Sequence, residues 1–106
     1  MHQFLPYAWF EGRCIPFDQA KVSIATHALH YGTGAFGGMR AIPDPEKPGG
    51  MLLFRPDRHA RRLSQSAKLL LADLTEETVM EALIAVLRAN KPTTPIYLRP
   101  FVYTSD

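Results

Sequence analysis

The stretch PDRHARRLSQSAKLLLADLTEETVMEALIAVLRAN, residues 56–90, decides the fold, because it carries the signals of two consecutive amphipathic helices. Pro56 and Asp57 are typical of a helix start. The apolar residues that follow recur at helical spacing: Ala60, Leu63, Ala67, Leu70 and Leu71. This spacing predicts a first helix with one apolar face.

A second helix is predicted directly after the first. Thr75 is suited to cap it, and Glu76 and Glu77 complement its positive N-terminus. Its buried stripe is expected to contain Val79, Ala82, Leu83, Val86 and Leu87. The segment 90–95 ends this helix.

The segments before the helical region predict β-strands. Residues 8–17, AWFEGRCIPF, predict a hairpin that turns at Glu11-Gly12-Arg13. Residues 35–42, AFGGMRAI, are typical of a strand interrupted by two glycines. Residues 51–55, MLLFR, are typical of a buried strand that closes a second hairpin across a proline-rich loop. Residues 21–32 give no clear pattern.

The last segment, IYLRPFVYTSD, alternates as a strand does. One face carries Tyr97, Arg99, Phe101 and Tyr103, and the other carries Ile96, Leu98 and Val102. Strands followed by helices predict an α+β domain, a two-layer sandwich with two helices on one face of a mostly antiparallel sheet. A chain of 106 residues supports one domain. Because it stops directly after a strand, we expect it to be cut from a longer protein.

Composition limits the class of protein. The chain is 46% apolar and carries a net charge of +2, which is far below what a protein devoted to polyanions carries. No apolar run approaches the length of a membrane span, and the N-terminus lacks the basic region of a signal peptide. Cys14 is the single cysteine, which fits a reducing compartment. We expect a cytoplasmic protein that binds neither nucleic acid nor membrane.

The glycines of YGTGAFGGMR, residues 31–40, match G-x-G-x-x-G. A dinucleotide-binding loop needs a strand before the motif and a helix opening on it, whereas here a strand-like segment and a proline-rich loop follow. The interpretation favoured instead is that the glycines permit a kinked strand and close packing.

The four histidines, at positions 2, 27, 30 and 59, show no ligand spacing, so we expect no metal site. His27 and His30 are interpreted as hydrogen-bonded structural residues, with a catalytic role as the alternative. Arg58, Arg61 and Arg62 form either a phosphate clamp or a solvated helix face. Arg62 lies closest to the apolar stripe, where a guanidinium is costly unless it meets an anion.

Arg99 is the most informative residue on physical grounds. It falls between Leu98 and Pro100 on a predicted interior strand, on the face that also carries aromatic residues. A charge in that position is paired either with a carboxylate of the protein or with the carboxylate of a ligand. Together with Tyr31 and Phe36, it has the composition of a pocket for a small acid with an apolar part.

Three segments in this order resemble one known family. They are HALHYGTGAFGGMR (27–40), FRPDRHARRLSQSAK (54–68) and IYLRPFVY (96–103). Together they resemble the N-terminal small domain of branched-chain amino acid aminotransferases, which are pyridoxal-phosphate enzymes of the class IV, or fold type IV, aminotransferases. The resemblance covers nearly the whole chain, 1–106, and three motifs in register make it specific.

The resemblance implies a role for six residues. In that family the arginine of H-x-x-R-L binds the phosphate of pyridoxal 5'-phosphate, and here that arginine is Arg62. The substrate-pocket residues implied are Tyr31, Phe36, Gly38, Tyr97 and Arg99. Phe36 and Tyr31 would pack the branched side chain, and Arg99 with Tyr31 would bind the distal carboxylate of glutamate or 2-oxoglutarate.

The implied reaction transfers the amino group of Leu, Ile or Val to 2-oxoglutarate, so amino acids and 2-oxo acids are the expected partners. Members of the family are homodimers whose sites borrow residues across subunits. The Schiff-base lysine lies in a following large domain that this chain lacks; the lysines present are Lys21, Lys47, Lys68 and Lys91. We therefore expect no catalytic residue here and no activity of the chain alone.

Several alternatives stay open. D-amino-acid aminotransferase and aminodeoxychorismate lyase share the small-domain architecture, although Tyr31-Gly32-Thr33 with Phe36 favours the branched-chain type. Gly37 departs from the family, where many members carry Glu. Outside the family, the alternative is a non-enzymatic binding or assembly domain. It would be either a free-standing half that binds a phosphorylated ligand or a basic module that binds nucleic acid through Arg55, Arg58 and Arg61.

Overall fold

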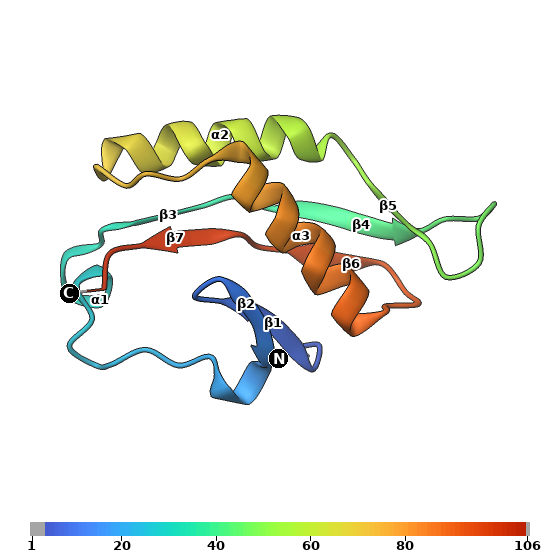
Figure 1. Ribbon diagram of the computed structural model, residues 1–106, viewed down its shortest axis with the longest axis horizontal. Helices are drawn as coiled ribbons and strands as arrows, with labels where there is room; N and C mark the ends of the chain where they lie inside the picture. Colours follow the sequence, from blue (N-terminus) through green and yellow to red (C-terminus); the bar gives the residue numbers. More distant parts are fainter. Residues whose placement is uncertain (1–3, 106) are drawn as a thin grey trace.

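The computed structural model describes residues 4–105 of the 106-residue chain, and Figure 1 shows two long helices lying against the strands. The N-terminal part contains β1 (Tyr7–Phe10), β2 (Arg13–Pro16), the 3₁₀ helix η1 (Phe17–Gln19), α1 (His27–Tyr31), β3 (Gly34–Phe36), β4 (Met39–Pro43) and β5 (Met51–Leu53). The C-terminal part contains α2 (Pro56–Leu69), α3 (Glu76–Asn90), β6 (Ile96–Leu98) and β7 (Phe101–Tyr103). The strand pairs are antiparallel, so the predicted α+β class is confirmed.

Both long helices form where the sequence predicts them. In α2 the buried residues include Ala60, Leu63 and Ala67. In α3 the Thr75 hydroxyl accepts a hydrogen bond from the backbone N–H of Thr78 at 3.1 Å, as a cap should. Val79 and Leu83 are the buried residues of its stripe.

The end of α2 corrects one prediction, because Leu71 does not belong to the apolar face. The N–H groups of Leu71 and Ala72 bond to the carbonyls of Lys68 and Ala67, each at 3.0 Å. This is a Schellman-type helix end, which requires a left-handed residue. Leu71 occupies that position with φ 58° and is 96% exposed.

The pairs β3–β7 and β4–β6 are two halves of one antiparallel ladder. Phe36 pairs with Phe101 and Met39 with Leu98, so the register does not change across the break between the halves. Gly37 therefore falls opposite Pro100, whose carbonyl accepts the Gly37 N–H at 3.0 Å. The strand interrupted by two glycines is confirmed. The partner strand is also interrupted, at Arg99-Pro100, because proline has no N–H to donate to the ladder.

This arrangement corrects the prediction that Arg99 lies on an interior strand. The three-stranded sheet has the order β5-β4-β6, so β6 is an edge strand, and Arg99 follows its last residue. The strand expected at residues 51–55 is shorter and is not buried, since β5 ends at Leu53, Leu52 is 44% exposed and Phe54 is 78% exposed.

One core joins the helices to one face of the ladder. Its buried members are Met39, Ala41, Ala60, Leu63, Val79, Leu83 and Leu98. Ile96 and Val102 pack against this core, whereas Tyr97 and Phe101 are more than half exposed. The predicted alternation of residues 96–103 is therefore confirmed, and the face with Phe36, Tyr97, Arg99 and Phe101 is called the open face below.

The hairpin β1–β2 packs against α3 beside this core. Its turn residues Glu11 and Gly12 have φ values of 52° and 88°, as a tight hairpin turn requires. The side-chain amide of Asn90 exchanges two hydrogen bonds of 2.9 Å with the backbone N–H and carbonyl of Tyr7. None of the helices within residues 4–105 is long and apolar enough to cross a membrane.

Candidate functional site

Four of the predicted site residues meet at the break in the ladder. The Arg99 guanidinium carbon lies 4.5 Å from the centre of the Phe36 ring and 5.4 Å from that of Tyr97. Arg99 Nε and Nη2 also donate to the Tyr97 hydroxyl, at 3.4 and 3.3 Å. Gly38 lies opposite Arg99 in register, directly beneath the Tyr97 hydroxyl. The open face thus has a guanidinium framed by two aromatic rings.

Two glycines make room for aromatic rings on this face. A Cβ at Gly38 would overlap the Tyr97 hydroxyl and lie 2.9 Å from the ring carbon Cζ. A Cβ at Gly34 would lie 2.6 Å from Cζ of Phe101. Each ring therefore leans diagonally over a glycine of the neighbouring strand. Close packing, and not a phosphate loop, is what these glycines provide.

Within residues 4–105, the side-chain ion pairs join Arg55 to Asp57 and Arg61 to Glu76, and neither includes Arg99. Of the two interpretations left open for Arg99, pairing with a protein carboxylate is therefore not observed in the described part of the chain. Its exposed guanidinium keeps donors available to an anion from outside the chain.

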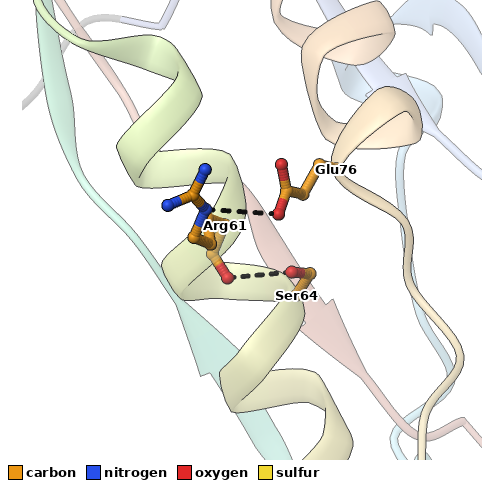
Figure 2. Close-up of polar contacts among 3 residues, drawn as sticks. All are labelled: Arg61, Ser64 and Glu76. Atoms are coloured by element: carbon orange, nitrogen blue, oxygen red, sulfur yellow. Dashed lines mark hydrogen bonds and ion pairs between the residues drawn. The ribbon is translucent and has the colours of Figure 1, made fainter.

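Two of the three clustered arginines of α2, Arg61 and Arg62, have different surroundings. Arg61 Nε lies 3.5 Å from a carboxylate oxygen of Glu76, and its carbonyl accepts the Ser64 hydroxyl at 2.8 Å, as Figure 2 shows. Arg62 points elsewhere: its Nη2 lies 3.8 Å from the position of a Cβ built on Gly37. Arg62 therefore lies beside the ladder break, although its side chain is exposed and not part of the core edge.

Arg62 also lines a cleft of about 270 Å³ at the start of α2, together with Phe54, Arg55, Arg58 and His59. Asp57 is the neighbouring carboxylate. Desolvation raises the pKa of Asp57, but hydrogen bonds from Arg55 and the Arg58 backbone, together with the charge of Arg55, outweigh it and lower that pKa overall. Asp57 thus engages Arg55 at 3.6 Å, whereas Arg58 and Arg62 form no ion pair with a carboxylate of residues 4–105.

Tyr31 lies apart from the other predicted pocket residues. It is the last residue of α1, at the opposite end of β3 from Phe36 (Figure 1). Its ring centre is 4.5 Å from that of His27 and 6.4 Å from that of His30. The structure does not bring Tyr31 and Arg99 together within one chain.

Both histidines of α1 make hydrogen bonds, as their structural interpretation predicts. His27 Nδ1 lies 2.8 Å from Thr33 Oγ1 and 3.0 Å from Thr104 Oγ1, and His30 Nε2 donates to the Ile24 carbonyl at 2.7 Å. Sequence reasoning missed Thr33 and Thr104, because nothing in a linear sequence pairs positions so far apart. Residues 4–105 contain no group of three or more side chains that could hold a metal ion, and His2 lies outside the described residues.

No protein-family model matches the chain. A probable branched-chain-amino-acid aminotransferase of Synechocystis sp. is 56% identical over 105 residues, which are 99% of this chain and 34% of that protein. The crystal structure of the Escherichia coli branched-chain amino acid aminotransferase superposes with a TM-score of 0.85 at 35% identity, over 97% of this chain and 33% of that one. The PLP-bound holo form of the Thermobaculum terrenum branched-chain amino acid aminotransferase matches with a TM-score of 0.81 at 32% identity, over 93% of this chain and 33% of that one.

These matches show first that the chain is similar to part of known aminotransferases. More narrowly, its sequence and fold are similar to about one third of the branched-chain aminotransferases, which confirms the resemblance inferred from three motifs. The chain spans about a third of the length of the relatives it matches. Neither D-amino-acid aminotransferase nor aminodeoxychorismate lyase is favoured by these matches.

Proposed function

We propose that residues 1–106 are the N-terminal small domain of a branched-chain aminotransferase that transfers the amino group of Leu, Ile or Val to 2-oxoglutarate. The 56% identity to the Synechocystis relative supports the reaction. The observation that carries the proposal is Arg99, an exposed guanidinium between Phe36 and Tyr97 without a carboxylate partner among residues 4–105. Such a group suits a substrate that is both acidic and partly apolar.

The open face supplies the substrate pocket in this proposal. Arg99 binds the distal carboxylate of glutamate or 2-oxoglutarate, and the Tyr97 hydroxyl holds the guanidinium in place. Phe36 offers apolar surface to a branched side chain, and Gly38 keeps the space into which Tyr97 leans. Tyr31, which lies at the far end of β3, would serve a site shared between subunits, so we expect a homodimer.

Pyridoxal 5'-phosphate is the proposed cofactor. Its phosphate is a dianion, which fits the exposed arginines of the cleft at the start of α2, and Arg62 is the residue that would hold it. The Thermobaculum terrenum relative was crystallised in its PLP form, which supports this choice. The cofactor supplies an electron sink for the amino acid. The chain's own lysines match no anchoring motif, so we expect the chain alone to be inactive.

A chimera tests the cofactor site. Residues 4–105 replace the matching segment of the Synechocystis relative, and pyridoxal phosphate affinity is measured by fluorescence titration. Arg62→Ala should weaken binding about ten- to hundredfold, since it removes charged hydrogen bonds. Arg61→Ala is the matched control, because Arg61 is engaged by Glu76 and does not line the cleft. Equal losses of cofactor affinity in both variants would show that Arg62 belongs to a solvated helix face and not to a cofactor site.

The same chimera tests the substrate pocket. Arg99→Ala should raise the KM for 2-oxoglutarate about ten- to hundredfold and change the KM for leucine much less. Equal losses for both substrates would remove the distal-carboxylate role. A folded chimera that binds the cofactor but does not transaminate leucine would contradict the proposed reaction. A reducing compartment suits the single Cys14, so we propose that the whole enzyme works in the cytoplasm.

A further inference from the structure

The short helix α1 is hydrogen-bonded to the residues that follow β7. The N–H groups of His27 and Ala28 donate to the carbonyls of Ser105 and Thr104 at 2.7 and 3.0 Å, and the Thr104 N–H donates to the Thr33 carbonyl at 3.1 Å. A helix of five residues does not hold its shape alone. The backbone after β7 therefore sets the position of α1.

Side chains add a second set of contacts at the same place. Nδ1 of His27 is within hydrogen-bond distance of the hydroxyls of both Thr33 and Thr104, and these two hydroxyls also contact each other. All three residues are half-buried. Nδ1 reaches these hydroxyls only while the His27 side chain keeps this rotamer, so the contact restrains the orientation of the ring.

The restrained ring packs against Tyr31. The two ring centres are 4.5 Å apart with their planes inclined by 37°, although Tyr31 is 72% exposed. An aromatic side chain so exposed samples several rotamers unless a neighbour restrains it. We propose that His27, held by Thr33 and Thr104, is a positioning residue that keeps the Tyr31 phenol in one orientation for a substrate carboxylate. The substrate part of this inference rests on the proposed function.

The positioning itself can be tested on the 106-residue chain by NMR. The paired change Thr33→Val with Thr104→Val removes both hydroxyls, and Thr33→Ser with Thr104→Ser keeps them. The valine pair should abolish the nuclear Overhauser contacts between the His27 and Tyr31 rings and move the Tyr31 signals toward those of free tyrosine, whereas the serine pair should keep both. Trp9 signals report that each variant is folded.

Unchanged Tyr31 signals in a folded valine pair would overturn the inference. If that pair does not fold, His27→Ala decides instead, since the two threonine hydroxyls can then still bond to each other. Hα–Hβ couplings of Tyr31 that still report a single χ1 rotamer in His27→Ala would equally overturn it. His30→Ala is the control, because His30 bonds to Ile24 and its ring lies farther from Tyr31.

The consequence for binding is measured in the chimera. The valine pair should raise the KM for 2-oxoglutarate about three- to tenfold with kcat changed less than about twofold, and the serine pair should restore the original KM. If Tyr31→Phe raises this KM and the valine pair does not, the positioning role is wrong. If Tyr31→Phe leaves the KM unchanged, the substrate role of Tyr31 fails, while the NMR result still decides whether His27 positions it.

Discussion

Replacing Gly38 with alanine tests the packing that builds the open face. The new Cβ would overlap the Tyr97 hydroxyl and lie 2.9 and 3.0 Å from the ring carbons Cζ and Cε1, closer than real Cβ contacts. Overpacking of this kind costs about 1–3 kcal/mol. Alanine also gains about 0.5–1 kcal/mol over glycine in extended backbone. The net expectation for Gly38→Ala is a loss of about 0–2.5 kcal/mol in the free energy of unfolding.

A double-mutant cycle isolates the clash. Urea unfolding is followed by Trp9 fluorescence for Gly38→Ala, Tyr97→Leu and the double variant. Without the tyrosine ring only the backbone gain remains, so alanine at position 38 should then stabilise the chain. Gly37→Ala is the control, because its Cβ would lie 3.7 Å from Pro100 and 3.8 Å from Arg62, which are ordinary contacts. A coupling energy below about 0.5 kcal/mol would refute the reasoning.

Three further predictions concern the helices and pH. Leu63→Ala should lower the free energy of unfolding by about 2–5 kcal/mol, because Leu63 is 3% exposed in the core; a urea titration showing less than about 1 kcal/mol would place it outside the core. Thr75→Ala should cost about 0.5–2 kcal/mol by the same assay through loss of the α3 cap, while Thr93→Ala, on an exposed loop, should cost little. Because the pKa of Asp57 is lowered on folding, its stabilising effect is fully present above about pH 4 and is lost as the pH falls through that lowered pKa. Thermal melts of Asp57→Asn should therefore depend less on pH in this acidic range than those of the original chain, and identical pH profiles would contradict this assignment.

Local signals were sufficient to predict most of the fold. The spacing of Ala60, Leu63 and Ala67 and the cap at Thr75 act within a few residues, so they can be read directly from the sequence. Leu71 misled the prediction because its apolar side chain continues the pattern while the backbone has already turned into a Schellman end. The short helix α1 was not predicted, since backbone bonds to residues 104 and 105 hold it and local periodicity does not.

The candidate site was only partly predictable for a related reason. Alternation along residues 96–103 was enough to put Arg99 and the aromatic residues on one face. The sequence also predicted close packing at the glycines, but not the rings that pack on them. Sequence alone could not pair Gly38 with Tyr97 or tell Arg61 from Arg62. Those distinctions depend on which side chain reaches Glu76 or Gly37 across the fold.

The constant register across the ladder break limits how this segment can change over time. Two residues, Gly37 and Gly38, lie opposite two others, Arg99 and Pro100, so the spacing on both sides is equal. Deleting or inserting one residue on either side would force one half of the ladder to slip, and every side chain in that half would turn to the other face. Either the core would lose residues such as Met39 and Leu98, or Phe36 and Phe101 would turn inward. Evolution can therefore substitute residues in this segment, but a change of one residue in the length of one strand alone requires a β-bulge to keep the two faces in place.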